Sequence, residues 1–108
     1  MALYHSTDSD GVSILNPDTA QMRVLLQSLN DPDNLDKDHP DVALIHDASG
    51  WMLSVYPSGI VAFENFNEPD EPPRYLRKLS QADCLKLWID LSKGRIEAIK
   101  SKNWTVED

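Results

Sequence analysis

The sequence predicts an α+β fold in which an antiparallel sheet of four or five strands packs against two main helices. Three observations support this class. Apolar residues recur at helical spacing between positions 22 and 29, a second amphipathic segment follows Ser80, and short apolar runs between them are separated by the turn signals Ser49-Gly50 and Ser58-Gly59. With 108 residues and 41% hydrophobic content, the chain is predicted to form a single domain.

The N-terminal third is predicted to begin with a poorly ordered segment or an edge strand, followed by one helix. Residues 1–11 are mostly polar, so we expect a poorly ordered terminus or an edge strand there. Asn16 and Pro17 are suited to cap and begin a helix, which ends near Asn30 because Pro32 disfavours helical geometry at the preceding residue. The predicted core-facing stripe consists of Met22, Leu25, Leu26 and Leu29.

Four apolar segments in the middle of the chain are predicted to form a β-meander. The segments are 41–47, 51–56, 60–66 and 74–79. Prolines at 69, 72 and 73 stiffen the loop before the fourth segment and discourage its pairing into the sheet.

The last long helix has the clearest boundaries. Ser80 followed by Asp83 has the form of a capping box, and Gly94 is suited to end the helix. Trp88 lies on its apolar side and is predicted to be buried. Four residues are expected to dock the tail onto the core: Ile96, Ile99, Trp104 and Val106.

The net charge is concentrated in two loops. Five aspartates surround Lys37 between positions 31 and 41, four further carboxylates lie between 64 and 71, and together these loops carry −8, the formal charge of the whole chain. This pattern predicts a local field that attracts cationic partners. A pI near 4.6 argues against binding nucleic-acid phosphates, and no apolar run approaches the ~20 residues that cross a bilayer.

No residue pattern indicates catalysis or a cofactor. His5, His39, His46 and Cys84 lack the spacing of a metal site, and residues 31–42 lack the glycine and glutamate of a calcium-binding loop. We therefore expect no catalytic residues, no metal and no cofactor, and a protein that is not an enzyme. The single cysteine and the absence of a signal-like N-terminus predict a cytoplasmic protein.

Strand direction divides the acidic residues into two groups. In a simple meander, the loop before the first strand and the loop between the third and fourth strands emerge at opposite ends, about 20 Å apart. The turn after the first strand shares an end with the second acidic loop. The predicted primary partner-binding residues are Asp47, Glu64, Glu68, Asp70 and Glu71, and the secondary ones are Asp31, Asp33, Asp36 and Asp38.

Two stretches of the C-terminal half form a distinctive pattern: residues 79–94 read LSQADCLKLWIDLSKG, and residues 104–107 read WTVE. This pattern resembles the tail of a family of bacterial immunity proteins. The helix at 17–29 and the strands at 42–45 and 51–55 follow the same order, so the resemblance covers about 12–106. The family is associated with polymorphic toxins, notably deaminase-type ones.

This resemblance implies an inhibitor that binds and occludes a cognate toxin domain with a basic surface, acting as a monomer or weak homodimer. It assigns no catalytic residues. Two other classes remain open at this point: a small cation-dependent regulatory or accessory domain using the loop 31–41, and a structural accessory subunit.

Overall fold

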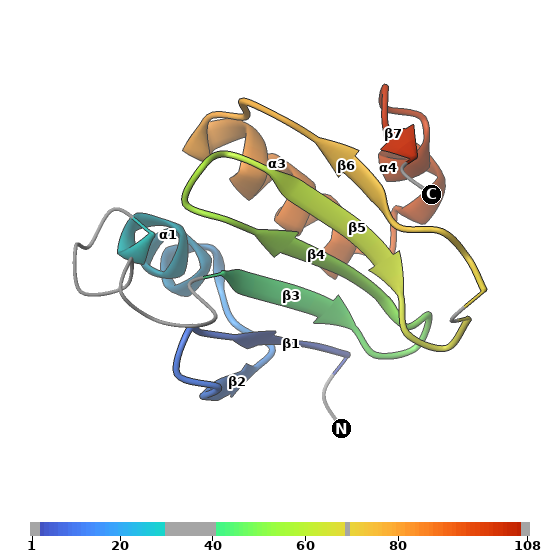
Figure 1. Ribbon diagram of the computed structural model, residues 1–108. Helices are drawn as coiled ribbons and strands as arrows, with labels where there is room; N and C mark the ends of the chain where they lie inside the picture. Colours follow the sequence, from blue (N-terminus) through green and yellow to red (C-terminus); the bar gives the residue numbers. More distant parts are fainter. Residues whose placement is uncertain (1–2, 30–40, 69, 107–108) are drawn as a thin grey trace.

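A single antiparallel sheet organises the part of the chain that the structure, a computed structural model, describes: residues 3–29, 41–68 and 70–106. In this part the strand order is β2-β1-β3-β4-β5-β6-β7, and the helices α1 and α3 lie against one face of the sheet (Figure 1). The strands are β1 (Tyr4–Thr7), β2 (Ser13–Leu15), β3 (Val42–His46), β4 (Trp51–Val55), β5 (Val61–Asn65), β6 (Arg74–Leu76) and β7 (Thr105–Val106). The helices are α1 (Thr19–Ser28), α3 (Gln81–Ser92) and α4 (Ile96–Lys100).

The predicted meander is confirmed, whereas the predicted number of strands is too low. Strands β3 to β6 are consecutive antiparallel neighbours. Three further strands, β1, β2 and β7, bring the count in the described part to seven instead of four or five. These strands are two to four residues long, and such short segments show no clear alternation of apolar and polar residues.

The N-terminal segment is better integrated than its composition suggests. Strand β1 pairs with both β2 and β3, so residues 4–7 form an interior strand, and the edge position belongs to β2. Asn16 fixes this arrangement, because its side-chain oxygen accepts hydrogen bonds from the backbone N–H groups of Leu3 and Tyr4 at 2.9 and 3.3 Å. The prediction of an edge strand or a loosely ordered terminus is therefore wrong for residues 4–7, which form an interior strand.

The start of α1 also differs from the prediction. Asp18 is the N-cap and forms a capping box with Gln21, in which each side chain accepts a hydrogen bond from the other residue's backbone N–H. Asn16 does not cap the helix, because its side-chain oxygen accepts the hydrogen bonds from Leu3 and Tyr4. The predicted apolar stripe is correct, since Met22, Leu25, Leu26 and Leu29 are all buried.

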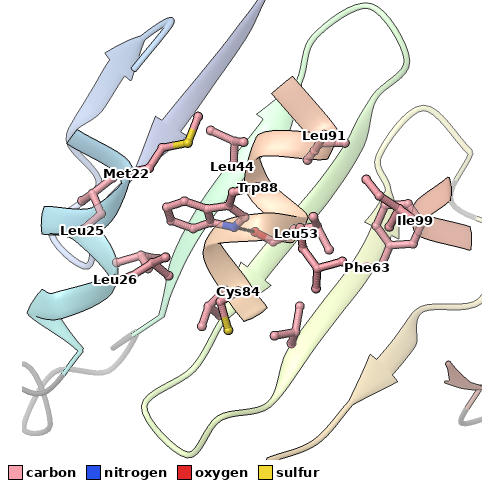
Figure 2. Close-up of a cluster of buried hydrophobic side chains, with 14 of the residues drawn as sticks. Met22, Leu25, Leu26, Leu44, Leu53, Phe63, Cys84, Trp88, Leu91 and Ile99 are labelled. Carbon is pink, nitrogen blue, oxygen red and sulfur yellow. Dashed lines mark hydrogen bonds between the residues drawn. The ribbon is translucent and has the colours of Figure 1, made fainter. Parts of the chain in front are cut away.

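The core lies between the sheet and the two longer helices. Trp88 of α3 is completely buried at its centre, between Met22, Leu25 and Leu26 of α1 and the sheet residue Leu53 (Figure 2). Its indole N–H donates a hydrogen bond to the Leu53 carbonyl at 3.2 Å. The predicted burial of Trp88 is confirmed, and its polar atom is satisfied as burial requires.

The ends of α3 and the tail follow the prediction in part. Ser80 accepts a hydrogen bond from Asp83 N–H, which is one of the two bonds of the predicted capping box. Gly94 takes a positive φ of 72° directly after the C-cap Lys93. Ile99 is buried, and the ring of Trp104 stacks on Phe63 at 5.2 Å. Val106 is 48% exposed because the last short strand pairs along the sheet edge instead of turning inward.

The opposite face of the sheet is left uncovered by the described helices. The pairing register places the small residues Ala43, Ser54 and Ala62 in one row across β3, β4 and β5 on this face, next to Tyr75 of β6. Residues one position away along each strand, such as Leu44, Leu53 and Phe63, face the helices (Figure 2). The sheet is therefore strongly apolar on one side and carries small and polar residues on the other.

Candidate functional site: the acidic end of the sheet

Two acidic segments lie at the same end of the sheet, as the strand directions predict. These are the turn from Asp47 to Gly50, between β3 and β4, and the loop from Phe66 to Pro73, between β5 and β6, at the right of the view in Figure 1. We call them together the acidic end. They are separated in sequence by about one hairpin, so their proximity follows from antiparallel pairing of β4 with β5.

Side-chain hydrogen bonds join the two segments into one unit. Asn65, the last residue of β5, is only 9% exposed, and its side-chain amide donates to the Ser49 carbonyl at 3.1 Å. The oxygen of the same amide accepts from Asn67 N–H at 2.9 Å. In addition, Phe66 N–H donates to the Gly50 carbonyl at 3.0 Å. The backbone around Phe66 is thus held from both sides.

Gly50 is required for this close approach. Its φ of +78° lies in the left-handed region that side chains disfavour, and a Cβ atom there would stand 2.4 Å from the Asn67 amide nitrogen and 2.9 Å from the Asn65 amide oxygen. Ser49 reinforces the turn, because its hydroxyl lies 2.7 Å from His46 Nδ1 and accepts a bond from Trp51 N–H at 3.3 Å.

Two of the five predicted primary residues are already paired within the molecule. Asp47 lies 2.8 Å from Nδ1 of His5, which connects the turn to β1. Glu71 lies 3.0 Å from Arg74, whose guanidinium is also placed over the ring of Trp51 at 5.5 Å. These contacts tie the turn to β1 and the loop to β6, and they engage the carboxylates of Asp47 and Glu71 within the molecule.

The other three predicted primary residues have no ion-pair partner in the described part of the chain: Glu64, Glu68 and Asp70. Glu68 and Asp70 are exposed in the loop, on either side of position 69. Glu64 belongs to β5 and is half-buried on the uncovered face of the sheet, opposite Met52. The acidic surface therefore continues from the loop onto that face.

Two carboxylates act on the Tyr56 phenol on the uncovered face. Burial raises the pKa of the Tyr56 phenol above its ordinary value, and the charges of Asp41 and Glu64 act in the same direction. Tyr56, Ile60, Tyr75 and the cationic Arg77 border a shallow depression of about 330 Å³ on this face. Asp41 stands beside the first residue of β3 and Glu64 near the last of β5, so two carboxylates at opposite ends of the sheet act on one face.

The predicted secondary residues Asp31, Asp33, Asp36 and Asp38 lie outside the described residues. The described residue closest to them that contributes to the acidic surface is Asp41. Its place beside Val42 lies at the end of β3 away from the acidic end, which agrees with the predicted separation of the two loops for the residues that can be compared.

Phe66 is the feature of the acidic end that the sequence did not single out. The prediction placed it at the end of a strand, whereas the strand ends at Asn65 and Phe66 lies in the loop with 55% of its surface exposed. One signal was available: in a strand with Phe63 facing the core, a residue three positions later faces the other way. Alternation alone would therefore have placed the ring of Phe66 on the side away from the core.

The described residues of the acidic end form no cluster suited to hold a metal ion. Within residues 3–29, 41–68 and 70–106, no three His, Cys, Asp or Glu side chains form a group that could hold a metal ion. Cys84 is buried under the sheet, and its burial raises the thiol pKa to about 11, so the sulfur stays protonated near neutral pH. The site as arranged can present charge and an aromatic ring to another molecule.

None of the described helices is long and apolar enough to cross a membrane. Comparison with protein-family models, curated proteins and solved structures found no significant match to this chain.

Proposed function

We propose that this protein neutralises a bacterial toxin domain that acts on nucleic acids, by binding over the toxin's active site through the acidic end. The observation that carries the proposal is the joining of two acidic segments by Asn65 and Gly50 into one surface, with Glu68 and Asp70 exposed and unpaired within the described residues. The resemblance of residues 79–94 and 104–107 to toxin-immunity proteins supports the same conclusion.

The charge of the partner follows from its substrate. A domain that binds nucleic acid surrounds its cleft with Lys and Arg, because phosphate contacts supply much of the affinity. Carboxylates arranged on a rigid end of a sheet compete for the same cations. Long-range attraction raises the association rate, while contact at the cleft excludes the substrate.

Inhibition in this proposal is by occlusion and needs no chemistry from the inhibitor. The protein is then neither an enzyme nor dependent on a cofactor. It acts in the cytoplasm, where it meets the toxin before the toxin reaches nucleic acid.

Charge reversal at the acidic end tests the proposal. The double variant Glu68→Lys/Asp70→Lys changes two exposed acids there, and the control Asp10→Lys/Asp83→Lys makes the same change in net charge at exposed positions in the β1–β2 turn and the first turn of α3. Candidate partners are toxin domains encoded beside the gene of this chain. Survival on co-expression and association kinetics at low and high salt are measured.

The acidic-end variant is expected to lose protection and to associate at least roughly 10-fold more slowly at low salt, with a smaller difference at high salt. The control is expected to keep most of the wild-type rate, because its charges lie at the other end of the sheet. Equal rates for the two variants would reject the acidic end as the binding surface. A toxin that kills in the presence of abundant wild-type protein would reject the inhibitor assignment.

A further inference from the structure

An exposed aromatic ring stands among the carboxylates of the acidic end. The chain has only two phenylalanines, and they lie in opposite environments: Phe63 is completely buried, whereas Phe66 is 55% exposed. Exposure of one large apolar side chain is ordinary on a protein surface, so it indicates binding only if the surroundings are suited to it. Two properties of the loop supply that context.

The first property is that the backbone carrying the ring is fixed. Phe66 donates its N–H to Gly50, and both neighbouring residues take part in the Asn65 side-chain bonds to Ser49 and Asn67. Glu68, two residues after Phe66, is held as well, because its N–H donates to the Asn65 carbonyl at 3.3 Å. A loop held in this way loses little backbone conformational entropy when a partner binds, which lowers the cost of binding.

The second property is the arrangement of charge around the ring. Glu64 and Glu68 stand two residues before and after Phe66, with Asp70 two residues further along the loop. An aromatic centre with a charged rim is the usual organisation of an energetic hot spot in a protein interface. The other large exposed hydrophobic residues in the described part are all aliphatic: Leu3, Val12, Leu15, Val24 and Val106.

We infer that Phe66 is the apolar anchor of the interface and enters an apolar pocket rimmed by Lys or Arg on the toxin domain. The inference rests on the proposed function and adds the residue that provides affinity. Charge complementarity selects this occupant over a second copy of the chain, because two acidic ends brought together would repel each other. The acids govern how fast the complex forms, and Phe66 governs how long it lasts.

Fluorine labelling gives a direct test. Replacing both phenylalanines by 4-fluorophenylalanine yields two ¹⁹F signals, with Phe63 as an internal reference from the core. The probe is a catalytically inactivated copy of the toxin domain that the wild-type protein neutralises on co-expression. On binding one equivalent, the Phe66 signal is expected to lose its solvent isotope shift between H₂O and D₂O, while the Phe63 signal stays unchanged.

Kinetics with matched variants complete the test. Phe66→Ala is expected to raise the dissociation rate roughly 30-fold or more, with the association rate within about 3-fold of wild type. Phe66→Leu should restore part of the lifetime. The control Leu15→Ala, at a residue 69% exposed on the edge strand, should change neither rate. Circular dichroism and thermal unfolding of each variant verify the fold.

Each outcome has a distinct meaning. A Phe66 signal that keeps its solvent shift in the stoichiometric complex, or a Phe66→Ala protein that dissociates like wild type, overturns the anchor and leaves the inhibitor function intact. Failure of the wild-type protein to neutralise any candidate toxin overturns the function, and the anchor with it.

Discussion

The core around Trp88 and the acidic end both join parts of the chain that are distant in sequence, but they do so with different forces. The core joins α1, α3 and the sheet mainly through apolar side chains (Figure 2). Trp88 adds a hydrogen bond to the Leu53 carbonyl of the sheet, and Gln81 adds one to the Leu26 carbonyl of α1. The acidic end joins a turn and a loop through directed hydrogen bonds of Asn65 and the close approach of Gly50. The core and the proposed recognition surface are therefore separable regions, and substitutions should affect stability and binding separately.

The largest effect on stability is expected at the centre of the core. Trp88→Ala removes a completely buried indole and leaves the Leu53 carbonyl without that donor, so the free energy of unfolding should fall by about 3–5 kcal/mol. Urea unfolding measures this loss. Where enough folded protein remains, binding of the toxin domain should keep its wild-type association rate. A loss below about 1 kcal/mol would contradict the central place of Trp88 in the core.

An intermediate effect is expected at the turn of the acidic end. Gly50→Ala adds a Cβ in a left-handed conformation and against Asn65 and Asn67, so it should cost about 2–3 kcal/mol, of which about 1–2 arises from the backbone alone. Gly11 supplies the matched control, since its φ is +80° and nothing lies within 4 Å of its Cβ position.

The difference between Gly50→Ala and Gly11→Ala in chemical unfolding isolates the contact with the loop. Adding Asn67→Ala to Gly50→Ala should recover part of the loss, because the shortest of these contacts is with the Asn67 side chain. Equal losses for the two glycine variants would show that the turn and the loop do not constrain each other.

Among the substitutions that should change both stability and binding, Asn65→Ala is expected to have the smallest effect on stability. This change removes the bonds to Ser49 and Asn67 and should cost about 1–2 kcal/mol. Faster hydrogen exchange of the Phe66 amide and a shorter lifetime of the complex should accompany it, since Phe66 would then stand on a loosened backbone. Asn67→Ala, at an exposed position, should change stability by less than about 0.5 kcal/mol. An unchanged Phe66 exchange rate would contradict the role assigned to Asn65.

The elements that the sequence predicts well are those in which apolar residues recur at a regular spacing. Met22, Leu25, Leu26 and Leu29 repeat at helical spacing and are all buried, and Trp88 lies where the apolar side of its helix places it. The short strands β1, β2 and β7 carry too few residues for a period. In addition, β1 pairs with β3 and β7 pairs with β6, which are distant from them in sequence. Local pattern cannot report a partner strand about 40 residues away.

The candidate site was predictable in outline and not in its contacts. Alternating strand direction was enough to place Asp47 and the loop 66–73 at one end. The pairing of Asp47 with His5 and of Glu71 with Arg74 depends on side-chain positions, which spacing does not determine. The same holds for Asn65, whose type is common in loops and whose buried amide here holds two segments together.

The insertion of β1 between β2 and β3 has a consequence for how the molecule is made. Tyr4 pairs with His46, so β1 is synthesised well before its neighbour on that side. The β3–β6 meander contains mainly local pairings and can form early, whereas the β1–β2 hairpin has to add to an already existing edge of the sheet. During synthesis, the exposed edge of β3 is therefore the surface most open to mispairing with another nascent chain.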